Sequence, residues 1–287
     1  MMKDQAERLR LKMQGIKKTK ALAVLSGKGG VGKSHFSINF ALSLHKLGYK
    51  VLLFDMDVGM GNVEILMGIS TQYTIADVLH GNVSVQEAVS KSSYGIDILS
   101  GGTGLNTLVE MDEGDITHLL SQFDVSFVQY DYVIFDMGAG MAKSVLSFLK
   151  AADEIVVLIT PEPTSLMDGY ASVKFMMMES LKGPYNVVIN KTSSLREGEI
   201  VFGRINKVTE KFLNGQLSYL GRIPTDSAVT KAAMKQVPFS VLYPNGKATK
   251  AVEELAASFV NPSSTQSSKG GFLARLKHQF LEKRERL

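Results

Sequence analysis

The chain alternates between short apolar runs and longer segments whose apolar residues recur at helical spacing. Residues 21–25 form a continuous apolar run, which predicts a strand buried on both faces. Phe36, Phe40 and Leu44 follow at intervals of four and predict a helix over residues 33–46. Strands are predicted over residues 21–26, 51–55, 95–99, 132–136, 154–160, 186–190 and 217–223. This order predicts an α/β fold, with a single doubly wound, mostly parallel sheet flanked by helices.

A glycine-rich loop separates the first predicted strand from the first predicted helix. From Gly27 to Ser34 it fits the phosphate-binding pattern G-x-x-x-x-G-K-[ST]. Its glycines let successive backbone N–H groups point at phosphate oxygens, and the following helix N-terminus adds to the attraction for anions. We expect Lys33 to contact the β- and γ-phosphates and Ser34 to hold Mg²⁺. The expected nucleotide-binding residues are Gly27, Lys28, Gly29, Gly30, Val31, Gly32, Lys33, Ser34 and His35.

Two strand ends carry carboxylates that suit a phosphate-hydrolysing site. Asp136 ends an apolar run and is predicted to act on Mg²⁺ directly or through water. Asp57 lies two residues past another predicted strand, before a glycine-rich stretch that includes Asn62. It is predicted to orient the attacking water and to lie near the metal. A single aspartate at a strand end is more often a turn or helix cap, but the phosphate loop reverses that weighting.

Lys28 is a second lysine in the loop, and its residue type leaves three interpretations open. It could be a solvated loop lysine, a charge that balances phosphate in its own subunit, or a group that reaches a partner's nucleotide across a dimer interface.

Composition limits the chemistry and separates the two ends from the body. The 287 residues include no cysteine, so disulfides, thiolate metal sites and thiol nucleophiles are excluded. Residues 1–20 lack the apolar core of a secretory signal, and no apolar run approaches the ~18 residues of a membrane span. Residues 1–20 carry a net charge of +5 and residues 269–287 a net charge of +4, which leaves −5 for the rest. The basic ends suggest acidic partners or lipid.

The last segment predicts an amphipathic helix after a flexible linker. Residues 261–271 are poor in apolar side chains and are interpreted as the linker. Residues 272–287 place one apolar face between basic side chains, which favours binding to an anionic membrane surface. The alternative is a final helix packed on the domain, and both hold if the helix docks in the monomer and is released in the dimer. The predicted membrane-binding residues are Phe272, Leu273, Leu276 and Phe280.

Several fragments together resemble the MinD/ParA family of ATPases with a deviant phosphate loop. They are residues 27–34, Asp55-Met56-Asp57 with Asn62, residues 136–140, Thr160-Pro161-Glu162-Pro163 with Asp168, Val188-Ile189-Asn190, and Ile223-Pro224-Thr225-Asp226. The resemblance covers roughly residues 20–260. It implies that ATP or ADP binds with Mg²⁺, that Lys28 reaches across an ATP-bound homodimer, and that Asn190, Pro224 and Asp226 lie at the adenine. His35 departs from the threonine that is usual in the family.

The N-terminus narrows the resemblance to the FlhG group (also called YlxH or FleN) of that family. Residues 4–10 resemble its DQAxxLR motif, which stimulates the GTPase FlhF; the expected partner-binding residues are Asp4, Gln5, Ala6, Leu9 and Arg10. The body adds residues 54–62 and 100–104 to this likeness. Ala6, Leu9 and Met13 form a short apolar stripe, although a disordered basic tail is the alternative.

The expected organisation is therefore an activator segment (1–20), an ATPase domain (21–260), a linker (261–271) and a membrane-targeting helix (272–287). The expected protein is a slow, partner-regulated ATPase that controls flagellar number and placement, in the cytoplasm and reversibly at the inner face of the cell membrane. C-ring proteins are expected as further partners. A division-site MinD, a ParA-like DNA-binding switch and a docking module remain alternatives, although the acidic body argues against a large DNA footprint, and no specific nucleic acid is expected.

Overall fold

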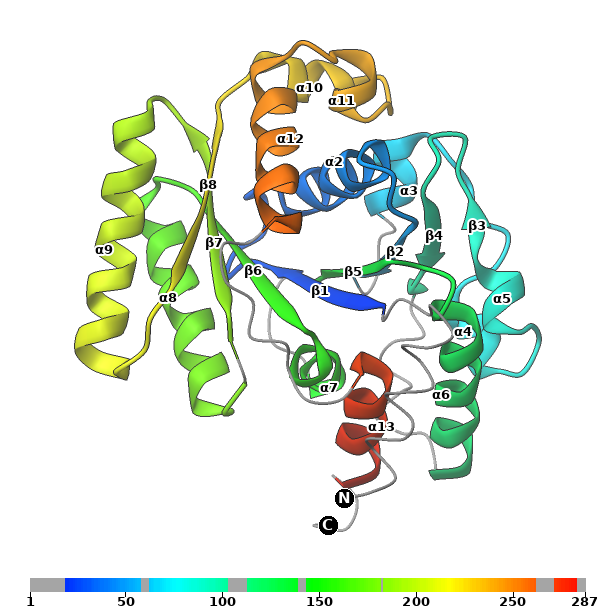
Figure 1. The fold of residues 1–287 in the computed structure, drawn as a ribbon. Helices are drawn as coiled ribbons and strands as arrows, with labels where there is room; N and C mark the ends of the chain where they lie inside the picture. The colour runs from blue at the N-terminus through cyan, green and yellow to red at the C-terminus, as the bar shows by residue number, and fades with distance from the viewer. Residues whose placement is uncertain are drawn as a thin grey trace.

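The computed structural model describes residues 19–57, 62–102, 113–138, 143–181, 183–261 and 271–282. Within these ranges one eight-stranded sheet has the order β3-β4-β2-β5-β1-β6-β7-β8 (Figure 1). Neighbouring strands are parallel, except β3, which pairs antiparallel with β4. The strands are β1 (Lys20–Leu25), β2 (Val51–Met56), β3 (Ser90–Lys91), β4 (Asp97–Ser100), β5 (Tyr132–Met137), β6 (Glu154–Ile159), β7 (Tyr185–Thr192) and β8 (Ser218–Pro224).

The predicted doubly wound sheet is confirmed. Each predicted strand lies within a few residues of an observed one. The edge strand β3 was not predicted, because its two residues are too few to carry a hydrophobic pattern.

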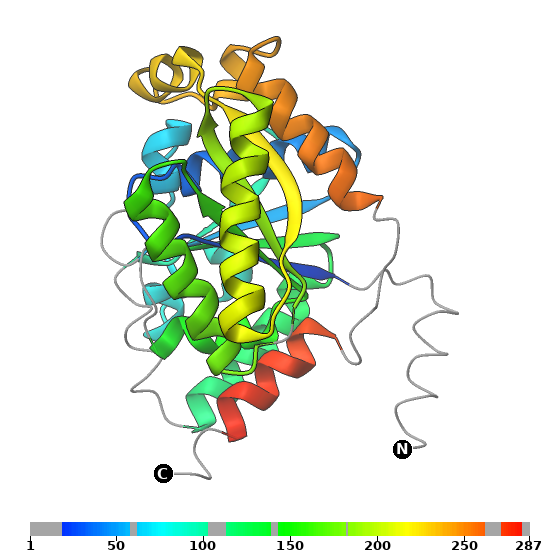
Figure 2. The same cartoon turned by 90° about the vertical axis from the view of Figure 1, so that its left-hand side faces the viewer.

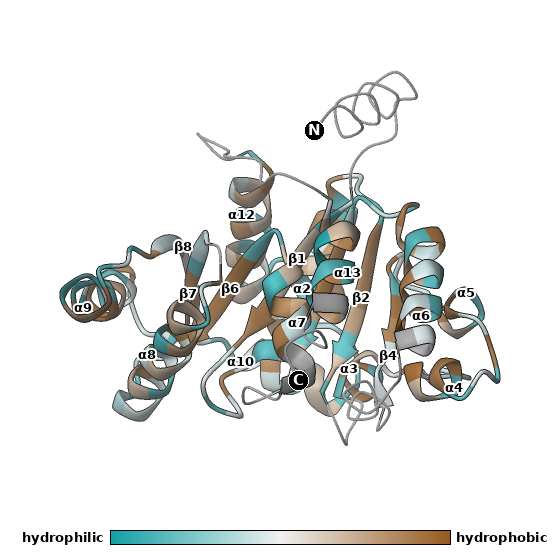
Figure 3. Cartoon of the chain, turned by 90° about the horizontal axis from the view of Figure 1, so that it is seen from below, coloured by the Kyte–Doolittle hydropathy of each residue, from teal (hydrophilic) through white to brown (hydrophobic). Residues whose placement is uncertain are grey.

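Helices cover both faces of the sheet (Figures 1 and 2). One face carries α2 (Lys33–Lys46), α3 (Asn62–Met67), α10 (Ser227–Met234), α11 (Phe239–Leu242) and α12 (Lys247–Val260). The other carries α4 (Ile75–Leu79), α5 (Val85–Ala88), α6 (Glu113–Phe127), α7 (Lys143–Ala151), α8 (Pro163–Met178), α9 (Leu195–Leu213) and α13 (Phe272–Glu282). Each face has its own hydrophobic core, so the central strands are apolar on both sides, as the brown strands of Figure 3 show.

Strand β5 illustrates how one strand serves both faces. Ile134 faces the core beneath α2, whereas Phe135 faces the core beneath α13. This alternation follows from the two-residue period of a strand. Asp136 comes next and is fully buried. It pairs in register with Asp55 on β2 and with Val24 on β1, so the chemistry-bearing residues meet at the carboxyl ends of the central strands.

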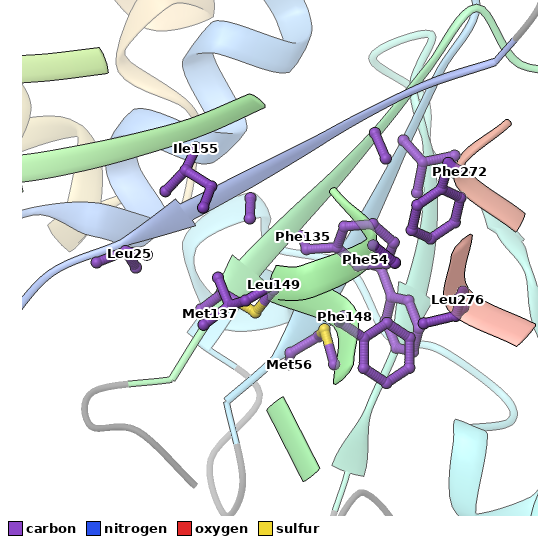
Figure 4. Packing of buried hydrophobic residues seen from close by; sticks show 14 of the residues in the cluster. Leu25, Phe54, Met56, Phe135, Met137, Phe148, Leu149, Ile155, Phe272 and Leu276 are labelled. Carbon is purple, nitrogen blue, oxygen red and sulfur yellow. The ribbon is translucent and has the colours of Figure 1, made fainter. Parts of the chain in front are cut away.

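The C-terminal helix α13 packs on the domain, against α6 and α7. Phe272, Leu276 and Phe280, spaced four apart, are buried, and Leu273 packs at the edge of the same core. The Phe272 ring lies 5.3 Å from that of Phe135, centroid to centroid, and Figure 4 shows Phe272 and Leu276 beside Phe54, Phe135 and Phe148. Of the arrangements that the sequence left open, this conformation has the helix packed on the domain, with the apolar face of Phe272, Leu273, Leu276 and Phe280 against the core. Binding of these residues to a membrane stays a prediction.

Candidate functional site

The phosphate loop lies between β1 and α2, as the sequence predicts. Gly30 and Gly32 have φ angles of +77° and +93°, the left-handed region that glycine adopts without strain. Gly32 is the N-cap of α2, so no side chain caps this helix, and its first turn holds no acidic residue. By contrast, side chains cap α5, α9 and α10. The N–H groups at the start of α2 are therefore left for a ligand, which suits a phosphate.

Strand β7 and helix α8 fix the shape of the loop. The Asn190 amide donates to the Val31 carbonyl over 2.7 Å, and the Lys191 ammonium donates to the Gly30 carbonyl over 2.9 Å. A Cβ atom at Gly27 would lie 2.1 Å from the Asp168 carbonyl oxygen, so the loop passes directly against α8. Lys191 lies outside the loop motif, and no signal in the sequence pointed to its role.

At the back of the site the lysine of the loop forms a buried ion pair. Lys33 Nζ lies 2.9 Å from Asp136 Oδ1, and both side chains are almost completely buried. The Ser37 hydroxyl donates to the same oxygen over 2.9 Å. The other carboxylate oxygen, Oδ2, is buried and has no hydrogen-bond partner among the described residues. Ser37 lies one helical turn past Ser34, outside the motif, and was not predicted.

Asp55 joins the two ends of the segment that carries Asp57. Its carboxylate accepts the Asp57 N–H over 3.0 Å and the Val63 N–H over 3.3 Å. The Asn62 amide in turn donates to Asp57 Oδ2 over 2.9 Å. Burial and the neighbouring Asp136 carboxylate raise the pKa of Asp55 to about 7. Asp55 was quoted for the family resemblance but was not among the predicted site residues.

The beginning of the glycine segment after β5 approaches Asp57 closely. A Cβ atom at Gly138 would lie 3.1 Å from Asp57 Oδ1. The segment that follows β2 and the glycine segment that follows β5 therefore meet at Asp57. Residues 139 and 140, which belong to the second of them, lie outside the described residues.

Lys28 differs from Lys33 in its surroundings. Its ammonium lies 3.4 Å from the Glu162 carboxylate and donates to the Thr164 hydroxyl over 3.1 Å. The side chains of Lys28 and Glu162 are 42% and 61% exposed, so solvent screens this pair and it contributes little to stability. Lys28 is thus accessible at the surface of the loop.

A cavity of about 700 Å³ opens beside the loop and is lined by both polar and apolar residues. Lys33, Ser34, His35 and Asp57 are among the polar ones. Burial, reinforced by the Lys191 ammonium, lowers the pKa of His35, which favours the neutral imidazole at pH 7. The apolar lining residues would suit a planar base and are Ile65, Leu66, Ile223, Pro224, Val229, Ala233 and Phe239.

The three residues expected at adenine reach the cavity, but two are occupied by other contacts. Asp226 caps α10: its oxygens accept the Ala228 and Ala248 N–H groups, and the Ala228 contact is the main reason that its pKa lies below the usual range. The Asn190 amide holds the loop, and its Oδ1 accepts the Lys191 N–H. Pro224 lines the cavity beside Ile223.

The residues present fit a magnesium ion that is held jointly with phosphate. The observation that supports this fit is Asp136 Oδ2. This oxygen is buried close to the loop and has no hydrogen-bond partner among the described residues, and oxygen is the ligand atom that Mg²⁺ prefers. Ser34 and Asp57 line the same cavity. Across the described ranges no three His, Asp or Glu side chains form a metal cage of their own. Mg²⁺ in such sites takes one or two protein oxygens together with phosphate oxygens.

Comparison with known proteins defines the class. The family model ParA, described as NUBPL iron-transfer P-loop NTPase, matches residues 17–260. MinD in the MinC:MinD cell division complex of Aquifex aeolicus shares the fold with a TM-score of 0.68 and 25% identity, over 88% of this chain and 100% of that chain. MinD of Pyrococcus horikoshii, complexed with Mg-ADP, has a TM-score of 0.68 at 22% identity, over 84% and 96%. Fold and loop together define a P-loop ATPase.

Sequence relatives narrow the class. Antiactivator FleN of Pseudomonas aeruginosa is 33% identical over 267 residues, covering 92% of this chain and 95% of its own. The flagellum site-determining protein YlxH of Helicobacter pylori is 30% identical over 248 residues, covering 86% and 84%. The chain therefore belongs to the MinD/ParA family of P-loop ATPases, in the FlhG branch that includes FleN and YlxH, and the resemblance inferred from its motifs is confirmed.

Two predicted features lie partly or wholly beyond the described residues. The partner-binding residues Asp4, Gln5, Ala6, Leu9 and Arg10 are outside them. Of the predicted C-terminal helix, residues 283–287 are also outside. None of the described helices is long and apolar enough to cross a membrane.

Proposed function

We propose that this ATPase is a nucleotide-switched regulator of flagellar number and placement. The observation that carries the proposal is its 33% identity to FleN over 92% of the chain, together with the DQAxxLR string at residues 4–10. A division-site MinD shares the ATPase domain, but that reading leaves the N-terminal extension unexplained.

In the proposed cycle, two ATP-bound protomers close face to face and each Lys28 reaches the nucleotide of the other. Its exposure and its weak pair with Glu162 support this role, because little free energy opposes the lysine changing partner. Lys33, by contrast, is buried and paired with Asp136, and it acts on the phosphates of its own subunit.

For hydrolysis, Asp57 orients the attacking water. The Asn62 amide and the clamp made by Asp55 hold the Asp57 side chain and backbone, which fixes the direction of its free oxygen. Lys33 and Lys28 stabilise the charge that develops on the γ-phosphate, and Mg²⁺, held by Ser34 and Asp136, would supply further charge neutralisation there. No glutamate lines the cavity among the described residues, so we expect hydrolysis to be slow until a partner completes the site.

Helix α13 carries the proposed membrane association, and its docked position implies that it must first leave the domain. Phe272, Leu276 and Phe280 cannot contact lipid while they pack beneath α6 and α7. One short amphipathic helix binds an anionic surface weakly, whereas two helices in a dimer gain by avidity. Vesicle co-sedimentation in ATP and in ADP tests this step: binding only in ATP supports it, and equal binding in both contradicts it.

The proposed flagellar role is tested most directly on FlhF. The truncation should stop at residue 18, because the Thr19 hydroxyl bonds to the Phe127 and Tyr130 carbonyls and β1 begins at Lys20. The full chain should stimulate the GTPase of purified FlhF, and the chain lacking residues 1–18 should not, while both bind ADP equally. Equal stimulation by the two chains would exclude an N-terminal activator.

A ParA-like DNA-binding switch is the alternative from a different class. It predicts ATP-dependent binding to DNA rather than to vesicles. The same co-sedimentation, with vesicles replaced by duplex DNA, separates the DNA-binding hypothesis from the membrane-binding one.

A further inference from the structure

Ser37 is a buried serine whose hydroxyl leaves its own helix. Serines inside helices commonly bond back to the carbonyl four residues earlier. Ser43 on α2 does so, to Asn39 over 2.7 Å, and Ser172 on α8 does so, to Asp168 over 3.0 Å. Ser37 instead donates across to Asp136 Oδ1 on β5 and is completely buried. The Ser37 hydroxyl therefore does not use the acceptor that a helical serine normally finds in its own helix, and its bond to Asp136 calls for another explanation.

The surroundings of Asp136 hold more negative than positive charge. Asp55 lies next to it in the strand register, and both carboxylates are buried. In the described part of the chain, Lys33 pairs with Asp136, Lys33 and Ser37 share Oδ1, and Oδ2 has no partner. Asp136 is thus held by two groups that act on one oxygen.

Nucleotide binding disturbs this arrangement. The lysine of a phosphate loop contacts the β- and γ-phosphates, so Lys33 must give up part or all of its bond to Asp136. A buried carboxylate that loses its cation is strongly destabilised unless another cation replaces it. Once Lys33 has moved, the Ser37 hydroxyl is the remaining group described here that holds the Asp136 side chain in place.

We propose that Ser37 is a positioning residue. It keeps Asp136 oriented while Lys33 moves from Asp136 to phosphate, so that Mg²⁺ can take over as the neutralising cation. Nucleotide and Mg²⁺ binding are then coupled through one carboxylate, and the strength of the coupling depends on the serine hydroxyl. The inference rests on the Mg²⁺-nucleotide site described above and adds to it a residue outside the loop motif.

The test compares Ser37→Ala with Ser43→Ala in the full chain. Both substitutions remove a buried hydroxyl from α2, but only the first touches Asp136. Binding of mant-ADP is followed by fluorescence at increasing MgCl₂ and, separately, in EDTA. We expect the Mg²⁺ midpoint of Ser37→Ala to rise about tenfold, as loss of a hydrogen bond to a charged acceptor implies. Its affinity in EDTA, where no Mg²⁺ ion requires an oriented Asp136, and both quantities in Ser43→Ala should stay near wild type.

Ser37→Thr restores the hydroxyl and should return the Mg²⁺ midpoint toward wild type, with thermal melts showing that each variant is folded at the assay temperature. A Mg²⁺ midpoint for Ser37→Ala equal to that of Ser43→Ala overturns the proposal. So does an equal loss of affinity with and without Mg²⁺, which indicates a structural role alone. If the wild-type chain fails to bind mant-ADP under every condition, the nucleotide site itself is wrong, and that result is distinct from the other two.

Discussion

The nucleotide edge and the groove beneath α13 are adjacent on β5 yet are built in opposite ways. Asp136 faces Lys33 and Ser37, whereas Phe135, the preceding residue, packs on Phe272. The first region consists of charged groups whose partners can be exchanged. The second consists of buried rings, each fully buried Phe or Leu contributing about 1.5–3 kcal/mol. Substitutions at the nucleotide edge should therefore alter nucleotide binding and catalysis. Substitutions in the groove beneath α13 should alter how often the apolar face of α13 is exposed.

The helix α7 connects the two regions. It begins six residues after the end of β5, and its last residue, Ala151, offers its carbonyl to the Arg275 guanidinium of α13 over 2.7 and 2.9 Å. Arg275 also pairs with Asp153 over 2.7 Å, and Asp153 accepts the Ala21 N–H at the start of β1. One helix, α7, thus lies in the chain directly after the segment that follows β5 and contacts α13 at its other end.

The largest effect at the nucleotide edge is expected from Gly27→Ala. The new Cβ would collide with the Asp168 backbone, so the loop must move. Because this movement shifts the N–H groups that hold the phosphates, ADP affinity should fall by about 100-fold. Calorimetry measures this affinity. Gly203→Ala on α9, outside the loop, is the matched control, since its Cβ would meet nothing within 4 Å. ADP affinity in Gly27→Ala equal to that in Gly203→Ala would contradict the prediction.

Asp57→Ala should separate catalysis from binding at the same edge. We expect the ATPase rate to fall about 100-fold while ATP affinity is retained and the ATP dimer accumulates. Single-turnover hydrolysis measures the rate, fluorescence of a mant-labelled nucleotide measures the affinity, and size-exclusion chromatography measures the amount of dimer. Hydrolysis at the wild-type rate would remove Asp57 from the proposed mechanism.

Arg275→Lys should act on the α13 groove alone. Lysine keeps the charge but lacks the planar fork that bonds to Ala151 and Asp153, so undocking of α13 should become about tenfold more frequent. Hydrogen exchange at the amides of residues 272–280 measures undocking, and Lys277→Arg, an exposed change on the same helix, is the control. ADP affinity should not change. A parallel loss of ADP affinity would mean that the two regions are more tightly coupled than their contacts imply.

The smallest expected effect is a pH dependence that arises from Asp55. Its pKa is about 7 in the fold and about 4 in the unfolded chain, so its contribution to stability is complete below about pH 4 and is lost as the pH rises through 7. Nucleotide-free wild-type protein should therefore melt a few degrees lower at pH 8 than at pH 5.5, relative to Asp55→Asn. Melting curves at both pH values check this, and an identical pH dependence in the two proteins would contradict it.

Local sequence was sufficient wherever function is encoded in consecutive residues. The spacing of residues 27–34 fixed the loop, and the apolar runs fixed the strands, since a strand buried on both faces needs a continuous apolar segment. Asp136 was predicted because it ends such a run. Ser37, Asp55 and Lys191 were not, because their roles depend on partners that are distant along the chain or on the backbone geometry of a loop. Asn190 and Asp226 were predicted at adenine, but their polar atoms bond to the backbone.

The sequence by itself determined the nucleotide loop and the amphipathic character of both ends, because these follow from residue spacing. It also indicated the class of protein, through the resemblance of several motifs to one family. Tertiary structure decided which cation neutralises Asp136 and where the apolar face of α13 lies. An amphipathic helix carries the same pattern whether it packs on lipid or on protein, and only the groove beside Phe135 and Phe148 distinguishes the two. The two lysines of one loop likewise look alike in sequence, and the fold buries one and exposes the other.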